Sequence, residues 1–162
     1  MSNKVIFEDY SAKVLQTLET KTINFLEEAG GLVESKAKEN TRVESGKTRR
    51  DWNHIVDEKG LKVTIGNTNI NGLYEEFGTG EHALYGNGRK GGWWICADQL
   101  DGKTRALFEN KYHFRKGYGK GGKVFYYTRG KKGTQALEKA INSSKSSIEN
   151  RARQIFKELG NK

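Results

Sequence analysis

The chain of 162 residues contains no proline, one cysteine and few large apolar side chains. Cys96 has no second cysteine with which to form an internal disulfide, and a multi-cysteine zinc site is excluded. Leu, Ile, Val and Phe make up about 21% of the residues, near the composition at which chains stop folding alone. We therefore expect a modest core and some segments that become ordered only beside a partner.

Long hydrophobic runs are also missing from the sequence. No window approaches the roughly 18 apolar residues that a membrane-spanning helix needs. The N-terminal segment carries Glu8 and Asp9 where a signal peptide needs a long apolar stretch. We expect one domain over residues 1–162, made in the cytoplasm and without a membrane partner.

Acidic residues are absent from residues 111–133, which hold eight Lys or Arg residues and almost all of the net charge of +9. The segment is also rich in glycine, of which the chain has 20. A field of this kind attracts polyanions, either nucleic acid or an acidic protein surface. The alternative is a solvated loop that only keeps the protein soluble.

The spacing of apolar residues predicts two long helices, over 9–40 and 134–159. Asp9 or Ser11 can cap the first helix, and Thr134 can cap the second. Gly30 and its neighbour Gly31 predict a kink or break. We interpret the first apolar stripe as core, with contact to a neighbouring subunit as the alternative.

Alternating and β-branched residues predict strands between these helices. Together they indicate an α+β fold, in which two terminal helices pack on one face of an antiparallel sheet of four or five strands. We expect a hairpin over 50–66 and extended segments at 73–77, 93–96 and 124–128. We also expect a short helix over 98–108 and two long Gly-rich loops at 78–92 and 117–133.

Basic and aromatic residues are interleaved in and beside the two loops. This combination suits a phosphate backbone and its bases, and it equally suits a protein interface. The candidate basic residues are Arg89, Lys90, Arg115, Lys116, Lys120 and Lys123, and the candidate aromatic residues are Tyr74, Phe77, Trp93 and Trp94. We expect the first two aromatics to anchor the sheet and the tryptophans to divide between core and interface.

Catalytic and cofactor signals are weak. Residues 86–91 and 117–122 both match G-x-G-x-x-G, but strand-like sequence follows each instead of the helix that a dinucleotide site requires. The three histidines lack metal-ligand spacing, and Glu75 and Glu76 would point to opposite faces of a strand. We expect no enzyme activity, cofactor or metal.

Several short motifs occur in a distinctive order along the chain. They are Val43-Glu44-Ser45-Gly46, Val63-Thr64-Ile65-Gly66, Glu76-Phe77-Gly78-Thr79-Gly80, Gly88-Arg89-Lys90-Gly91-Gly92-Trp93 and Thr128-Arg129-Gly130-Lys131-Lys132-Gly133. This order resembles the head–tail connector family, also called neck or tail-completion proteins, of long-tailed bacteriophages. The string over 76–80 is its most specific part.

The resemblance implies a structural virion protein of the neck, located between capsid and tail. Such a protein would join the portal-side connector to the tail as part of a ring through which DNA passes. Its expected partners are copies of itself, other connector, tail-terminator or tail-tube proteins, and double-stranded DNA in non-specific contact. The candidate basic residues would meet DNA phosphates or an acidic ring. The alternative function is a small basic nucleic-acid-binding module.

Overall fold

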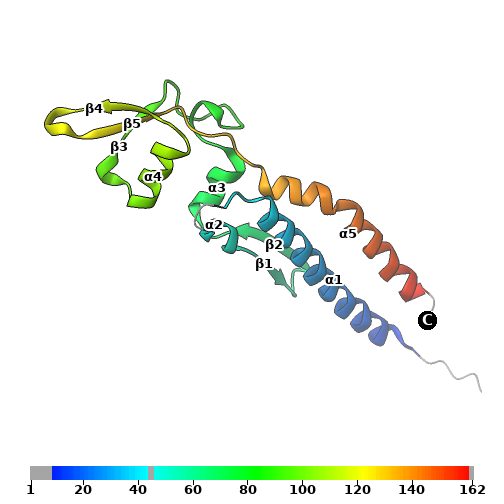
Figure 1. The fold of residues 1–162 in the computed structure, drawn as a ribbon. Coiled ribbons are helices and arrows are strands. Elements are labelled where there is room, and N and C mark those ends of the chain that lie inside the picture. The colour runs from blue at the N-terminus through cyan, green and yellow to red at the C-terminus, as the bar shows by residue number, and fades with distance from the viewer. Residues whose placement is uncertain (1–8, 44–45, 161–162) are drawn as a thin grey trace, which may run out of the picture. The chain divides into compact units, whose positions relative to one another are not determined.

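The computed structural model describes residues 9–43 and 46–160. Over these residues the chain is α+β, as predicted, with five α-helices and two small antiparallel sheets (Figure 1). The helices are α1 (Ser11–Asn40), α2 (Lys47–Arg50), α3 (Ile70–Phe77), α4 (Gly102–Asn110) and α5 (Ala136–Gly160). The strands are β1 (Trp52–Asp57), β2 (Lys62–Asn67), β3 (Trp93–Cys96), β4 (Arg115–Tyr118) and β5 (Val124–Thr128).

The chain forms two compact units. Unit 1 comprises residues 1–69 and 136–162, and unit 2 comprises residues 70–135. The single domain predicted over 1–162 stays a prediction. In the described part of both units, no helix is long and apolar enough to cross a membrane.

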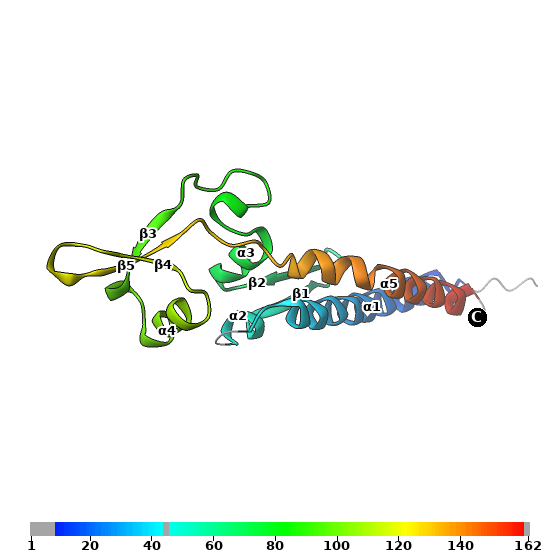
Figure 2. The same cartoon turned by 45° about the horizontal axis from the view of Figure 1, so that its top comes forward.

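Unit 1 is built around α1. Helix α5 lies antiparallel beside α1, and the β1–β2 hairpin also packs against α1 (Figures 1 and 2). Exposed ion pairs connect the two helices, because Arg151 donates to both carboxylate oxygens of Glu28 and Lys21 pairs with Glu158 at 2.7 Å. Such exposed pairs fix the register of the helices more than they stabilise the fold.

The core of unit 1 is small. It contains Val33, Ala37, Trp52, Ala136 and Ala140, with partly buried aliphatic residues packed around them. The indole N–H of Trp52 donates to the buried Thr41 hydroxyl at 2.8 Å, so the one large polar aromatic in this core is satisfied. Most of the core residues are alanine-sized, which agrees with the modest core expected from the composition.

Helix α1 continues through Gly30 and Gly31, so the predicted break is wrong. The glycine has a packing role instead. A Cβ atom at Gly30 would lie 2.5 Å from Cδ2 of His54 and 2.8 Å from a methyl group of Val63. Gly30 is therefore a notch that lets the β1–β2 hairpin approach the helix, and this contact outweighs the helix-propensity cost of glycine.

Unit 2 contains α3, α4 and a three-stranded sheet in the order β3–β5–β4. The single sheet expected from the sequence is thus wrong in detail, because the five strands divide between the two units. The extended segment expected at 73–77 is also wrong, because it belongs to α3. Strand β4, at the start of the basic segment, was not anticipated.

The two glycines of α1 give a matched pair of substitutions. Gly30→Ala forces a methyl group against the His54 ring, and we expect it to lower the free energy of unfolding by about 1–3 kcal/mol. Gly31→Ala has its nearest neighbour at 3.8 Å and should be neutral or stabilising by up to about 1 kcal/mol. Urea unfolding followed by far-ultraviolet circular dichroism measures both. Equal effects of the two substitutions would contradict the notch.

Candidate functional site

Two segments of unit 2 that are distant in sequence lie backbone against backbone. We call this contact between residues 76–80 and 129–133 the glycine interlock. The amide of Thr79 donates to the carbonyl of Lys131 at 2.8 Å, and the amide of Lys131 donates to Oγ1 of Thr79 at 3.0 Å. The two most conspicuous strings of the motif pattern, at 76–80 and 128–133, therefore form one structural element.

Glycine is required at several positions of the interlock because no side chain fits between the segments. A Cβ atom at Gly80, Gly130 or Gly133 would overlap a backbone carbonyl oxygen of the opposite segment. At Gly78, a Cβ would lie 2.7–2.8 Å from three backbone atoms. Gly78, Gly80 and Gly130 also have positive φ values, which L-residues rarely adopt.

The buried Glu75 forms further hydrogen bonds beside the interlock. Its side chain accepts a hydrogen bond from the Lys131 ammonium group, and its backbone carbonyl accepts one from the Thr134 hydroxyl at 3.0 Å. Thr134 is thus bound to α3, and α5 begins two residues later, so the predicted cap at Thr134 is wrong.

Glu75 and Glu76 lie on a helix, which corrects their predicted positions on a strand.

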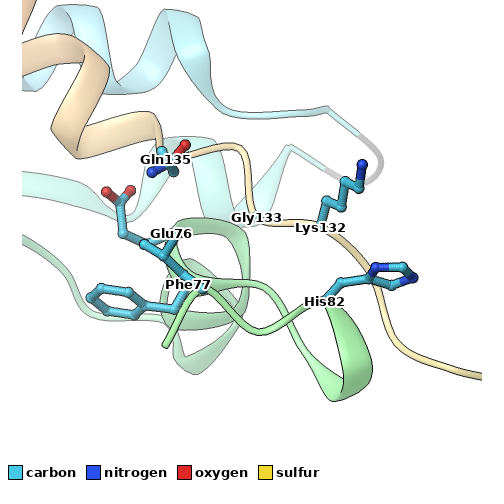
Figure 3. A pocket seen from close by; sticks show the side chains of 7 residues that line it. Glu76, Phe77, His82, Lys132, Gly133 and Gln135 are labelled. Atoms are coloured by element: carbon cyan, nitrogen blue, oxygen red, sulfur yellow. The ribbon is translucent and has the colours of Figure 1, made fainter. Parts of the chain in front are cut away.

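A half-open pocket of about 240 Å³ lies beside the interlock (Figure 3). It is lined by Glu76, Phe77, His82, Leu84, Lys132, Gly133 and Gln135. In Figure 3, the Phe77 and Glu76 side chains lie at one end and those of His82 and Lys132 at the other. The volume is below the usual range for small-molecule sites, so the pocket is suited to a single side chain rather than a cofactor.

The four predicted aromatic residues fall into two groups. Tyr74 and Phe77 lie on α3 and not on an extended segment, and their role as anchors of the sheet stays a prediction. Tyr74 is 43% exposed, whereas Phe77 pairs with the Tyr85 ring at 5.6 Å. Of the two tryptophans on β3, Trp93 is half-buried and Trp94 is exposed, and their division between core and interface stays a prediction.

Each tryptophan on β3 is in contact with one of the predicted basic residues. The guanidinium of Arg89 lies 5.6 Å from the ring centroid of Trp93, and that of Arg115 lies 5.8 Å from the ring centroid of Trp94. Both are cation–π contacts, which leave the positive charge accessible to a partner. The sequence predicted these residue types together, but not which arginine meets which ring.

The four predicted lysines are not equivalent. Lys116 pairs with Glu109 at 3.2 Å, so a neighbouring carboxylate neutralises its charge. The side chains of Lys90, Lys120 and Lys123 are exposed, and their ammonium groups form no hydrogen bond or ion pair within residues 9–43 and 46–160. Only these three of the four predicted lysines are therefore uncompensated charges.

Glu109, the partner of Lys116, also binds the buried Tyr126. The Tyr126 hydroxyl donates to Glu109 at 2.5 Å, and this bond together with Lys116 lowers the pKa of the Glu109 carboxyl. Burial and the same hydrogen bond raise the pKa of Tyr126. Both groups therefore keep their ordinary charge at neutral pH, and the network holds α4 against the sheet.

Unit 1 contains a cluster that the sequence reasoning missed. Nδ1 of His54 lies 2.5 Å from Glu34, and its Nε2 lies 3.1 Å from Glu27. These hydrogen bonds, that to Glu34 foremost, raise the pKa of His54, and bonds from Lys38 and His54 lower the pKa of Glu34. The two glutamates are seven residues apart on α1, on either side of the Gly30 notch, and this spacing was the available signal.

No group of three or more His, Cys, Asp or Glu side chains in the described ranges is placed to hold a metal ion. The two G-x-G-x-x-G matches are followed by β3 and β5, so neither opens a helix, as the sequence indicated. Comparison of the chain with protein-family models, curated proteins and solved structures gives no match. The site must therefore be interpreted from its own geometry.

The His54 cluster predicts a pH-dependent stability of unit 1. Because the pKa of His54 is raised above its usual 6.5, its contribution is complete below pH 6.5 and is lost as pH rises through the raised value. Urea unfolding should therefore show a lower free energy at pH 8.5 than at pH 6, and His54→Gln should reduce this difference. An unchanged difference in the variant would contradict the account.

The glycine interlock predicts a strong contrast between two glycines that both have positive φ. Gly91→Ala adds a methyl group in open space, so only the backbone strain of about 1–2 kcal/mol applies. Gly80→Ala adds the same strain and also overlaps the opposite backbone, so we expect loss of the native packing of unit 2. Hydrogen exchange of residues 70–135 reports this. Equal protection in the two variants would refute the interlock.

Proposed function

We propose that this chain is a structural subunit of the neck of a long-tailed bacteriophage. It joins the portal-side connector to the tail as part of a ring through which DNA passes. The glycine interlock is the observation that carries the proposal. Segments 76–80 and 128–133, which bear much of the resemblance, contact each other through glycines that cannot be replaced, so their shared occurrence has a structural cause.

Exposed apolar residues on the helices of unit 1 support an assembling subunit. Val14 and Leu15 on α1 are 58% and 64% exposed, and Phe156 on α5 is 67% exposed. Large apolar side chains that stay accessible on a helix mark interaction surfaces. Leu15 and Leu18 belong to the stripe interpreted as core, so its first turns favour the alternative of contact with a neighbouring subunit.

The unpaired lysines fit the same role. In a ring around DNA, Lys90, Lys120 and Lys123 of every copy would contribute to a positive field, which attracts phosphates or an acidic neighbouring ring. Lys116 is less suited to this role because Glu109 compensates its charge. Head-to-tail contacts between identical subunits close into such rings.

The unpaired lysines also favour the second candidate, a small basic nucleic-acid-binding module. A dedicated binder should hold duplex DNA as a monomer, with an affinity that falls steeply as salt rises. A neck subunit should bind free duplex weakly and require assembly for function. Oligomeric state and duplex affinity of the same sample therefore separate the two functions.

The exposed face of α1 provides the direct test. We expect Leu15→Glu to prevent assembly, because a carboxylate would be buried at the contact between copies. Gln16→Glu places the same charge on the next residue, which is exposed and polar, and should assemble normally. Light scattering after size-exclusion chromatography measures the particle mass. Particles of unchanged mass in Leu15→Glu would exclude this face from the ring contact.

A further inference from the structure

One face of the three-stranded sheet in unit 2 carries a row of aromatic side chains. In the register of the strands, Tyr127 on β5 lies between Trp94 on β3 and Arg115 on β4. Residues directly opposite each other point to the same face of a sheet. In the next row of that face, Phe125 lies between Cys96 and Gly117. Three aromatic residues and one arginine thus share a single surface.

The glycines of β4 and its turn keep this surface flat. A Cβ atom at Gly117 would lie 2.8 Å from the Trp94 ring, and one at Gly119 would lie 2.7 Å from the Phe125 ring. Without these side chains, the two rings extend over the neighbouring strand. Trp94 stays 45% exposed, and its ring centroid lies 5.2 Å from that of Tyr127.

The opposite face of the same sheet differs in character. It carries Tyr126, which is fully buried and meets the Phe108 ring of α4 at 5.5 Å. Lys116 also lies there and is neutralised by Glu109. Around Tyr126 the opposite face is therefore covered by α4 and its lysine is charge-compensated, whereas Tyr118 at the end of β4 stays exposed on that face.

Positive charge without a counter-ion accompanies the aromatic face. Arg115 has its guanidinium over Trp94, and the turn between β4 and β5 carries Lys120 and Lys123, whose ammonium groups pair with no carboxylate within the described ranges. Residues 111–133 contain no acidic residue that could compete with an anionic ligand. The ligand that this surface favours therefore combines negative charges with flat apolar groups.

We propose that the face formed by Trp94, Phe125, Tyr127 and Arg115, here called the aromatic face, binds single-stranded nucleic acid. Unpaired bases stack on the rings of this face, of which Trp94 is exposed and Phe125 and Tyr127 are half-buried, while Arg115 and the turn lysines contact the phosphates. A duplex offers the phosphates but keeps its bases stacked inside, so it cannot use the rings. Every residue of the aromatic face belongs to unit 2.

The test uses the full-length chain and two fluorescein-labelled probes, a 12-nucleotide oligothymidine and a 12-base-pair duplex. Fluorescence anisotropy should show tighter binding of the single strand. Trp94→Ala removes a stacking surface and should weaken single-strand binding about tenfold, with little effect on duplex binding. Tyr118→Ala is the matched control, because Tyr118 is 78% exposed on the same hairpin but points to the other face.

A second measurement on the unaltered protein covers the case in which Trp94→Ala disturbs the fold. Ultraviolet crosslinking to the oligothymidine, followed by peptide mapping, should place the crosslinks on Trp94, Phe125 or Tyr127. Crosslinks confined to other residues, equal affinity for strand and duplex, or no binding of the oligothymidine would overturn the proposal. The last of these results would assign the aromatic face to a protein partner.

Discussion

The close approach of two backbone segments in unit 2 is the constraint on which the rest of the unit depends. Residues 76–80 and 129–133 contact each other without intervening side chains, which only glycine allows. The contact joins the end of α3 to the segment after β5, and buried Glu75 adds a polar bond to Lys131. The position of the sheet relative to α3 follows from this contact, and so does the position of the pocket beside Phe77.

Ion pairs, and not the number of basic residues, determine which lysines of this protein keep an uncompensated charge. Lys116 and Lys131 sit in the basic segment, yet each has a glutamate partner, whereas Lys120 and Lys123 have none in the described ranges. The sequence has eight positive charges within the 23 residues of 111–133. Because glutamates pair with some of them, the uncompensated lysine charges lie at the turn between β4 and β5. A neck subunit that guides DNA and a surface that binds unpaired bases both make use of such a turn.

The sequence predicted the α+β class, both long helices and four of the five strands, because the helices and the hairpin have regular apolar spacing and the strands at 93–96 and 124–128 are rich in β-branched and aromatic residues. The predictions from sequence were wrong where a glycine or a tertiary contact determines the local structure. Ile70, Leu73, Tyr74 and Phe77 have helical spacing, but residues 73–77 were predicted as a short extended segment that ends at Gly78-Thr79-Gly80. Gly30 suggested a break because its neighbour His54, which needs the space, is 24 residues away in sequence. The pairing of lysines with glutamates is likewise absent from any local pattern.

The proposal of a neck subunit combines the motif order, the interlock that explains it, and the apolar residues exposed on α1 and α5. Its central claim is that copies of this chain form a ring that docks on the portal-side connector. Negative-stain electron microscopy of the purified protein, alone and mixed with portal assemblies, tests this claim most directly. The account predicts annular particles, or additional density at the portal exit. Monomers that leave the portal assemblies unchanged would contradict it.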